Sequence, residues 1–216
     1  MTIRLAISVE GPTEQEFCRE VLCPHFLDRD MVMVPVVVTT KRIIDGPNFK
    51  GGSISIDRIQ NEVRPLLRSF HYVSTLYDYY GFVDREDNET PDQLCLRIAA
   101  ALGNPPTLIP YVQVHEFESL IFSGPDAVGQ CMQSAALGKE LYQAVQTCGS
   151  PEQVNDSPAT APSKRLTNSF SLHLKSKYDK KFHGPLLTLE IGLAVIRAGC
   201  PRFDNWLSRL ETLPTR

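Results

Sequence analysis

The chain has 216 residues, of which 42% are apolar and 22% are charged, and its formal net charge is −3. These values are typical of a globular protein, and the length allows one domain or a core with an appendage. Because its net charge is weakly negative, the protein does not belong to the class of strongly basic nucleic-acid-binding proteins. Any contact with nucleic acid therefore depends on local basic patches.

The sequence predicts a cytoplasmic protein without membrane contact. No apolar run approaches the roughly 20 residues that span a bilayer. No signal peptide precedes the apolar stretch that begins the chain. The 6 cysteines lack metal-binding spacing, and we expect them to be reduced, mostly buried thiols.

In the first half of the chain, short apolar runs alternate with helical patterns. The runs are residues 3–9, 31–40, 71–77 and 108–114, and the helical patterns are residues 13–28, 56–67 and 90–102. Thr13 and Glu16 fit a capping box for the first helix. Pro35 places the second run at a sheet edge. The alternation predicts a mostly parallel sheet flanked by helices, an α/β fold.

After residue 114 the sequence shows no further strand pattern. Helical patterns cover residues 116–122, 125–136, 137–147, 163–174, 186–198 and 203–210. Residues 149–163 are rich in Pro, Ser, Thr and Ala, which favours a loop. We therefore expect an α/β core over residues 1–123 and a C-terminal α-helical extension over residues 124–216, packed on the core.

Acidic residues follow three of the predicted strands. They are Glu10 with Glu14, then Asp78, then Glu116 with Glu118. The carboxyl ends of parallel strands meet at one edge of a sheet, where active sites of such folds lie. Gathered carboxylates need a cation, and their hard oxygen atoms suit Mg²⁺ or Mn²⁺. The alternative is that each is an ordinary loop acid. The pattern favours a metal site for phosphoryl chemistry.

Basic residues gather in residues 163–183, against the single acid Asp179. They are Lys164, Arg165, Lys175, Lys177, Lys180 and Lys181. This patch is predicted to bind the phosphate backbone, and Lys177 or Lys181 to stabilise transition-state charge. A second predicted nucleic-acid-binding element consists of Lys41, Arg42 and Lys50. The alternative for both is a solvated surface.

Two interpretations are open for each of three further residues, His115, Tyr79 and Tyr80. His115 is a candidate metal ligand or proton shuttle, but a hydrogen-bonded histidine at a strand end fits equally well. The two tyrosines are candidates for base stacking, although packing is the commoner role of aromatic residues.

Short motifs of the sequence resemble those of two known families. Glu10-Gly11-Pro12-Thr13-Glu14 resembles the EGxTE signature of TOPRIM domains in OLD-type nucleases, and Asp78 resembles the first Asp of the TOPRIM DxD motif. Several motifs of the chain, taken together in their order, resemble the bacterial domain-of-unknown-function family 4276 over nearly the whole chain. These motifs are residues 78–82, 115–123, 162–166 and 200–207.

The resemblance implies a TOPRIM fold and divalent-metal chemistry. Glu10 would be a metal ligand or general acid/base, with Glu14 and Asp78 as further ligands. The sequence departs from the motif at Tyr80, where the second Asp of DxD would fall. Either Glu118, which we favour, or its neighbour Glu116 would supply the missing ligand.

The resulting hypothesis is a metal-dependent nuclease, a hydrolase of DNA or RNA. The resemblance further implies an anti-phage defence system with an ATPase partner of the ABC or AAA class. The alternative is a non-catalytic binding or regulatory module that docks on such an ATPase. A nucleotide-binding α/β protein ranks last, because the sequence has neither GxGxxG nor a P-loop. The choice between DNA and RNA and homo-oligomer formation stay open.

Overall fold

The computed structural model describes residues 2–41, 49–50, 54–155 and 160–214, with the backbone alone for 39–41 and 49–50. The chain divides into two compact units. Unit 1 comprises residues 1–113 and 208–216, and unit 2 comprises residues 114–207. The sequence predicts the boundary after residue 123, whereas unit 2 begins at Val114. Nowhere in the described ranges is a helix both long enough and apolar enough to cross a bilayer.

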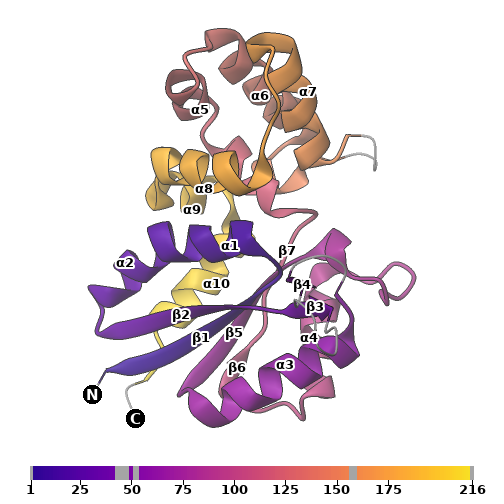
Figure 1. Ribbon diagram of the computed structural model, residues 1–216, viewed down its shortest axis with the longest axis vertical. Helices are drawn as coiled ribbons and strands as arrows, with labels where there is room; N and C mark the ends of the chain where they lie inside the picture. The colour runs from indigo at the N-terminus through magenta and orange to yellow at the C-terminus, as the bar shows by residue number, and fades with distance from the viewer. Residues whose placement is uncertain (1, 42–48, 51–53, 156–159, 215–216) are drawn as a thin grey trace. The chain divides into compact units, whose positions relative to one another are not determined.

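Unit 1 is built on a parallel sheet (Figure 1). Its strands are β1 (Ile3–Val9), β2 (Met31–Val37), β5 (Tyr72–Asp78), β6 (Leu108–Ile109) and β7 (Val112–Gln113). They run in the order β2-β1-β5-β6, and β7 also pairs with β5. Every residue of β5 is buried, as expected for a central strand covered on both faces. The Pro35-containing strand β2 lies at an edge, which confirms that prediction.

Helices cover both faces of this sheet, which confirms the predicted α/β architecture (Figure 1). They are α1 (Pro12–Phe17), the π-helix η1 (Cys18–Leu22), α2 (Cys23–Leu27), α3 (Ile56–Ser69) and α4 (Pro91–Ala101). Ala6, Val73 and Tyr77 of the sheet pack with apolar residues of α3 and α4 in one buried cluster. Two further strands, β3 (Thr39–Lys41) and β4 (Phe49–Lys50), pair antiparallel.

Unit 2 consists of helices in the ranges that the structure describes. They are η3 (Phe117–Ser123, 3-10), α5 (Pro125–Cys131), α6 (Ala135–Cys148), η4 (Pro151–Gln153, 3-10), α7 (Pro162–Leu174), α8 (Lys180–Ile191), α9 (Leu193–Gly199) and α10 (Pro201–Glu211), whose last turn belongs to unit 1. Among its side chains, Phe117, Phe122, Phe170 and Phe203 are fully buried.

Three local predictions were wrong. The predicted strand at 108–114 is two short strands, because Pro110 has no N–H for the ladder. Thr75 bridges this break: its hydroxyl donates to the Tyr111 carbonyl at 2.7 Å and accepts from the Tyr111 N–H at 2.8 Å. The predicted helix at 116–122 is mostly a 3-10 helix, η3. The first helix is capped by Glu14 rather than by Thr13 with Glu16.

The cysteine prediction is confirmed only in part. None of the six cysteines forms a disulfide, but only two of them are buried and the other four are half-buried. Cys18 and Cys200 are buried, and burial raises the pKa of both.

Candidate functional site

Glu10 and Asp78 leave the sheet of unit 1 at the same edge. β1 and β5 are parallel neighbours, and Val9 lies opposite Leu76. Glu10 follows β1 directly, and Asp78 is the last residue of β5. Asp78 is 6% exposed, whereas Glu10 is half-buried with its Oε2 shielded from solvent. The prediction that these two acids reach one sheet edge is therefore in agreement with the strand register.

The carboxylate of Glu10 lies against the backbone of Gly81, at the end of the 3-10 helix η2 (Tyr79–Gly81). An ideal Cβ on Gly81 would collide with Glu10 Oε2 and would stand 3.0 Å from its Cδ. Only the missing side chain of Gly81 leaves room for this position. The chain after β5 thus forms a cradle for the acid that follows β1.

Gln113 is a residue of this edge that sequence reasoning missed. It is the last residue of β7, pairs with Asp78 in the parallel register, and is fully buried. Its Oε1 accepts a hydrogen bond from the Tyr111 hydroxyl at 2.8 Å. The available signal was an amide side chain within an apolar run at the end of a predicted strand.

Glu14 caps helix α1. Its side chain is 2% exposed, and its Oε2 accepts a hydrogen bond from the Gly11 N–H at 2.9 Å. A carboxylate at this position also interacts favourably with the helix dipole. The described contact of Glu14 is therefore structural, and its role as a metal ligand stays a prediction.

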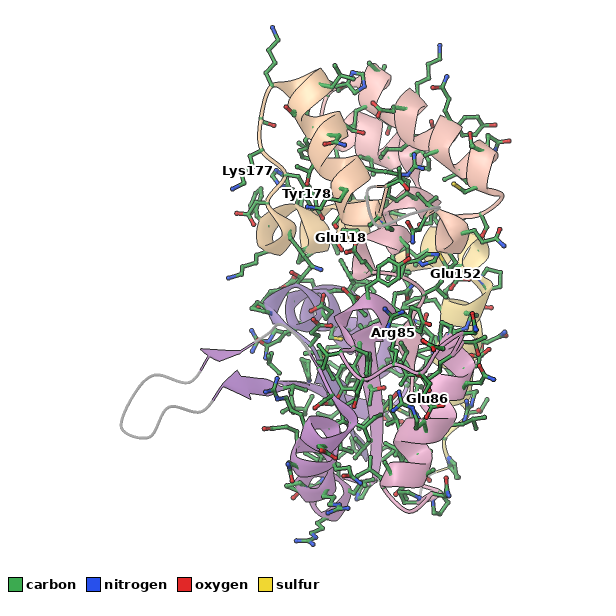
Figure 2. All side chains as sticks on the ribbon, turned by 90° about the vertical axis from the view of Figure 1, so that its right-hand side faces the viewer. Arg85, Glu86, Glu118, Glu152, Lys177 and Tyr178 are labelled. Atoms are coloured by element: carbon green, nitrogen blue, oxygen red, sulfur yellow. The ribbon has the colours of Figure 1, made fainter. Side chains whose placement is uncertain are left out.

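Arg85, in the loop after η2 (Figure 2), lies against the rings of Tyr79 and Tyr80. The Arg85 guanidinium lies 4.3 Å from the centre of the Tyr79 ring and 5.6 Å from that of Tyr80. Such cation–π contacts contribute about 0.5–1 kcal/mol each at exposed sites. Tyr80, which stands where the TOPRIM resemblance would require a second Asp, thus contacts Arg85 and the ring of Tyr79.

Two acids of the same loop serve structural contacts. Asp84 Oδ2 accepts from the Ile56 N–H at 2.8 Å and caps α3. The carboxylate of Glu89 accepts two hydrogen bonds from Arg97, at 2.7 and 2.8 Å. These bonds from Arg97 lower the pKa of Glu89. The described contacts of Asp84 and Glu89 are therefore structural.

In unit 2, the buried side chains of Glu118 and Tyr178 lie side by side (Figure 2). Glu118 is 0% exposed, and Lys180 Nζ lies 3.2 Å from its Oε2. Burial, reinforced by the negative charge of Glu118, raises the pKa of Tyr178 well above its ordinary value. The His183 ring stacks on Tyr178 with the ring centres 5.6 Å apart. Lys180, predicted to contact nucleic acid, here neutralises a buried acid.

Glu116 and His115 are also engaged within unit 2. Glu116 Oε2 accepts from the Ser163 N–H at 2.9 Å, in the first turn of α7. His115 has a left-handed backbone, with φ 62, and its Nδ1 lies 3.3 Å from Asn155 Nδ2. Burial lowers the pKa of His115, which favours the neutral imidazole.

The remaining basic candidates are mostly exposed. Lys164, Lys175, Lys177 and Lys181 are exposed residues of unit 2. Arg165 is half-buried, and its Nε donates to the Thr160 carbonyl at 2.9 Å. Of the other predicted element, Lys41 and Lys50 lie in β3 and β4, of which only the backbone is described. Arg42 lies outside the described residues.

The predicted acids are thus divided between the units. Glu10, Glu14 and Asp78 belong to unit 1, whereas Glu116 and Glu118 belong to unit 2. Across the described parts of the chain, no three side chains of His, Cys, Asp or Glu form a group that could hold a metal ion. The pair at the edge of the unit 1 sheet is Glu10 and Asp78.

Comparisons with known proteins place the chain in one family. Neither a curated protein nor a solved structure matches it. A family model described as a domain of unknown function covers residues 9–211 and so includes nearly all of both units. The chain belongs to this family, Domain of unknown function (DUF4276).

Proposed function

We propose that the protein is a divalent-metal-dependent nuclease that hydrolyses phosphodiester bonds of DNA or RNA. One observation carries the proposal: the carboxylates Glu10 and Asp78 end neighbouring parallel strands at one sheet edge. Open parallel sheets bind their ligands beyond this edge. The TOPRIM resemblance of the same residues supports the choice of phosphoryl chemistry.

The donor set fits a magnesium or manganese ion. Mg²⁺ is commonly held by one or two carboxylates, with water and substrate phosphates completing its shell. Glu10 and Asp78 would supply those carboxylates, and Gly81 leaves the space that the Glu10 side chain occupies. A bound ion would polarise a phosphoryl oxygen and lower the pKa of a water molecule.

The other acids predicted as metal ligands make different contacts. Glu14 caps α1, Glu116 binds the Ser163 N–H, and Glu118 binds Lys180. Exposed lysines of unit 2, among them Lys177 and Lys181, would contact the phosphate backbone. The function of Glu10 and Asp78 is then to hold the ion and accept a proton, and that of the lysines is to bind the strand.

The proposal is tested by cleavage of labelled single- and double-stranded DNA and RNA with Mg²⁺ or Mn²⁺. We expect cleavage by the wild-type protein and a loss of at least about a hundredfold in Glu10→Gln and Asp78→Asn, because a metal centre contributes several kcal/mol to the transition state. Glu86→Gln, which changes an exposed acid of the loop after η2, is the matched control and should cleave normally. Equal rates in all four proteins would refute the assignment.

A second candidate is a non-catalytic module that docks on an ATPase of the ABC or AAA class. It is favoured by Tyr80, which stands at an acidic position of the TOPRIM pattern and contacts Arg85. Titration calorimetry separates the two candidates. No heat with millimolar Mg²⁺ or Mn²⁺ favours the module, whereas binding that Glu10→Gln abolishes favours the enzyme. Co-purification with an ATPase encoded beside it would test the proposed defence role under either candidate.

A further inference from the structure

Helices α5 and α6 of unit 2 form a hairpin whose backbones meet at two glycines (Figure 1). An ideal Cβ on Gly138 would stand 2.9 Å from the Pro125 carbonyl oxygen and 3.3 Å from the Gly129 Cα. The turn between the helices contains Gln133 in the left-handed region, with φ 52. Because no side chain fits at the crossing, longer side chains to either side rise around a hollow.

The hollow has a volume of about 550 Å³. This lies within the range of roughly 300–1,000 Å³ found for small-molecule sites. The two glycines line its floor, and the longer side chains that line it are Asp126, Gln130, Gln133, Lys139 and Tyr142. All of it belongs to unit 2, so it is separate from the Glu10 and Asp78 pair.

The five longer side chains are not engaged in the fold. Among the residues that the structure describes, none of the five takes part in a hydrogen bond, ion pair or ring contact. Tyr142 is 53% exposed, which leaves a large aromatic surface in water. These side chains therefore remain available to a ligand.

The chemistry of the hollow selects a flat ligand with hydrogen-bonding edges and an anionic group. Tyr142 offers an aromatic face for stacking. The carboxamides of Gln130 and Gln133 each donate and accept, as the edge of a nucleobase does. Lys139 offers a cation for a phosphate, and Asp126 an acceptor for sugar hydroxyls. A purely apolar ligand would desolvate these polar groups without replacing their bonds to water.

We infer that the hollow between α5 and α6 binds a nucleotide, with its base stacked on Tyr142 and its phosphate on Lys139. The nucleotide is either free or part of a single strand, since both present the same base and phosphate. The inference goes beyond the proposed cleavage reaction and requires no metal.

Binding is measured by NMR titration and calorimetry on the full chain, with EDTA present. The probes are the four ribonucleoside 5′-monophosphates and, in a second arm, short single-stranded oligonucleotides. We expect binding that Tyr142→Ala weakens about tenfold or more, because stacking on an aromatic ring contributes substantially to each bound base. Tyr142→Phe keeps the ring and should bind normally. Lys139→Ala should weaken the binding of every probe, because all of them carry phosphate.

Leu172→Ala, at a 68% exposed position of α7 outside the hollow, is the matched surface control and should bind like the wild type. Binding of mononucleotides identifies a free nucleotide as the ligand, and binding of oligonucleotides alone identifies a strand. The inference is overturned if no probe binds at millimolar concentration, or if Tyr142→Ala binds as the wild type does. Glu10→Gln should bind normally, so failure here leaves the cleavage proposal untouched.

Discussion

The carboxylate of Glu10 occupies the space that a side chain at Gly81 would fill. Glu10 follows β1, whereas Gly81 ends the 3-10 helix after β5, so the contact joins two stretches distant in sequence. The φ of Gly81 lies outside the left-handed region, which means that alanine can adopt the same backbone conformation. The glycine is therefore required by the close approach of Glu10 and not by backbone strain.

Gly81→Ala should displace the Glu10 carboxylate and weaken Mn²⁺ binding about tenfold, with little change in melting temperature. The stability is preserved because the end of a glutamate side chain can rotate away at small cost. Calorimetry with Mn²⁺ measures the affinity. Glu86→Gln, which changes an exposed acid of the loop after η2, should keep the wild-type affinity. An unchanged Mn²⁺ affinity in Gly81→Ala would show that ion binding does not depend on the position of the Glu10 carboxylate against Gly81.

Lys180→Met should destabilise the protein by about 2 kcal/mol, because it leaves the buried Glu118 carboxylate without its lysine. The value is below that of a fully buried pair, since the Lys180 side chain is 40% exposed. Urea unfolding measures the change. The neighbouring Lys181 is exposed, and Lys181→Met should stay within about 0.5 kcal/mol of the wild type. Equal losses in the two variants would argue against the ion pair.

Glu89→Gln should lower the free energy of unfolding by about 2 kcal/mol at pH 7, through loss of charge-assisted bonds to Arg97. The bonds from Arg97 lower the folded-state pKa of Glu89 below the ordinary value of 4.5. The contribution of the Glu89 charge to the free energy of unfolding is therefore complete above pH 4.5. It is lost as the pH falls through the lowered, folded-state pKa. The gap between variant and wild type should shrink near pH 3.

Urea unfolding at both pH values checks this prediction. Glu86→Gln, which changes an exposed acid of the same loop, should match the wild type at each pH. A gap for Glu89→Gln that stays constant or widens on acidification would contradict the pairing with Arg97.

The parallel sheet could be predicted because its determinants are local. The apolar run that became β5 is buried along its whole length, and Pro35 confines β2 to an edge. The same logic brought Glu10 and Asp78 to one edge, since residues after parallel strands leave the sheet together.

The partners of the other acids could not be predicted, because they depend on tertiary contacts. Glu116 binds the Ser163 N–H, and Glu152 binds the N–H groups of Arg202 and Phe203 at the start of α10. A carboxylate that caps a distant helix has no signature in its own neighbourhood. The contact between Lys180 and Glu118 is likewise set by the packing of α8 against η3, which separates Lys180 from the exposed lysines beside it.

The central claim is that Glu10 and Asp78 share one divalent ion. Anomalous diffraction from crystals soaked in Mn²⁺ tests it most directly. We expect one peak about 2.0–2.2 Å from a carboxylate oxygen of each residue, and its disappearance in Glu10→Gln. A fully soaked crystal with no peak at these side chains, or with the ion bound at other acids, would contradict it.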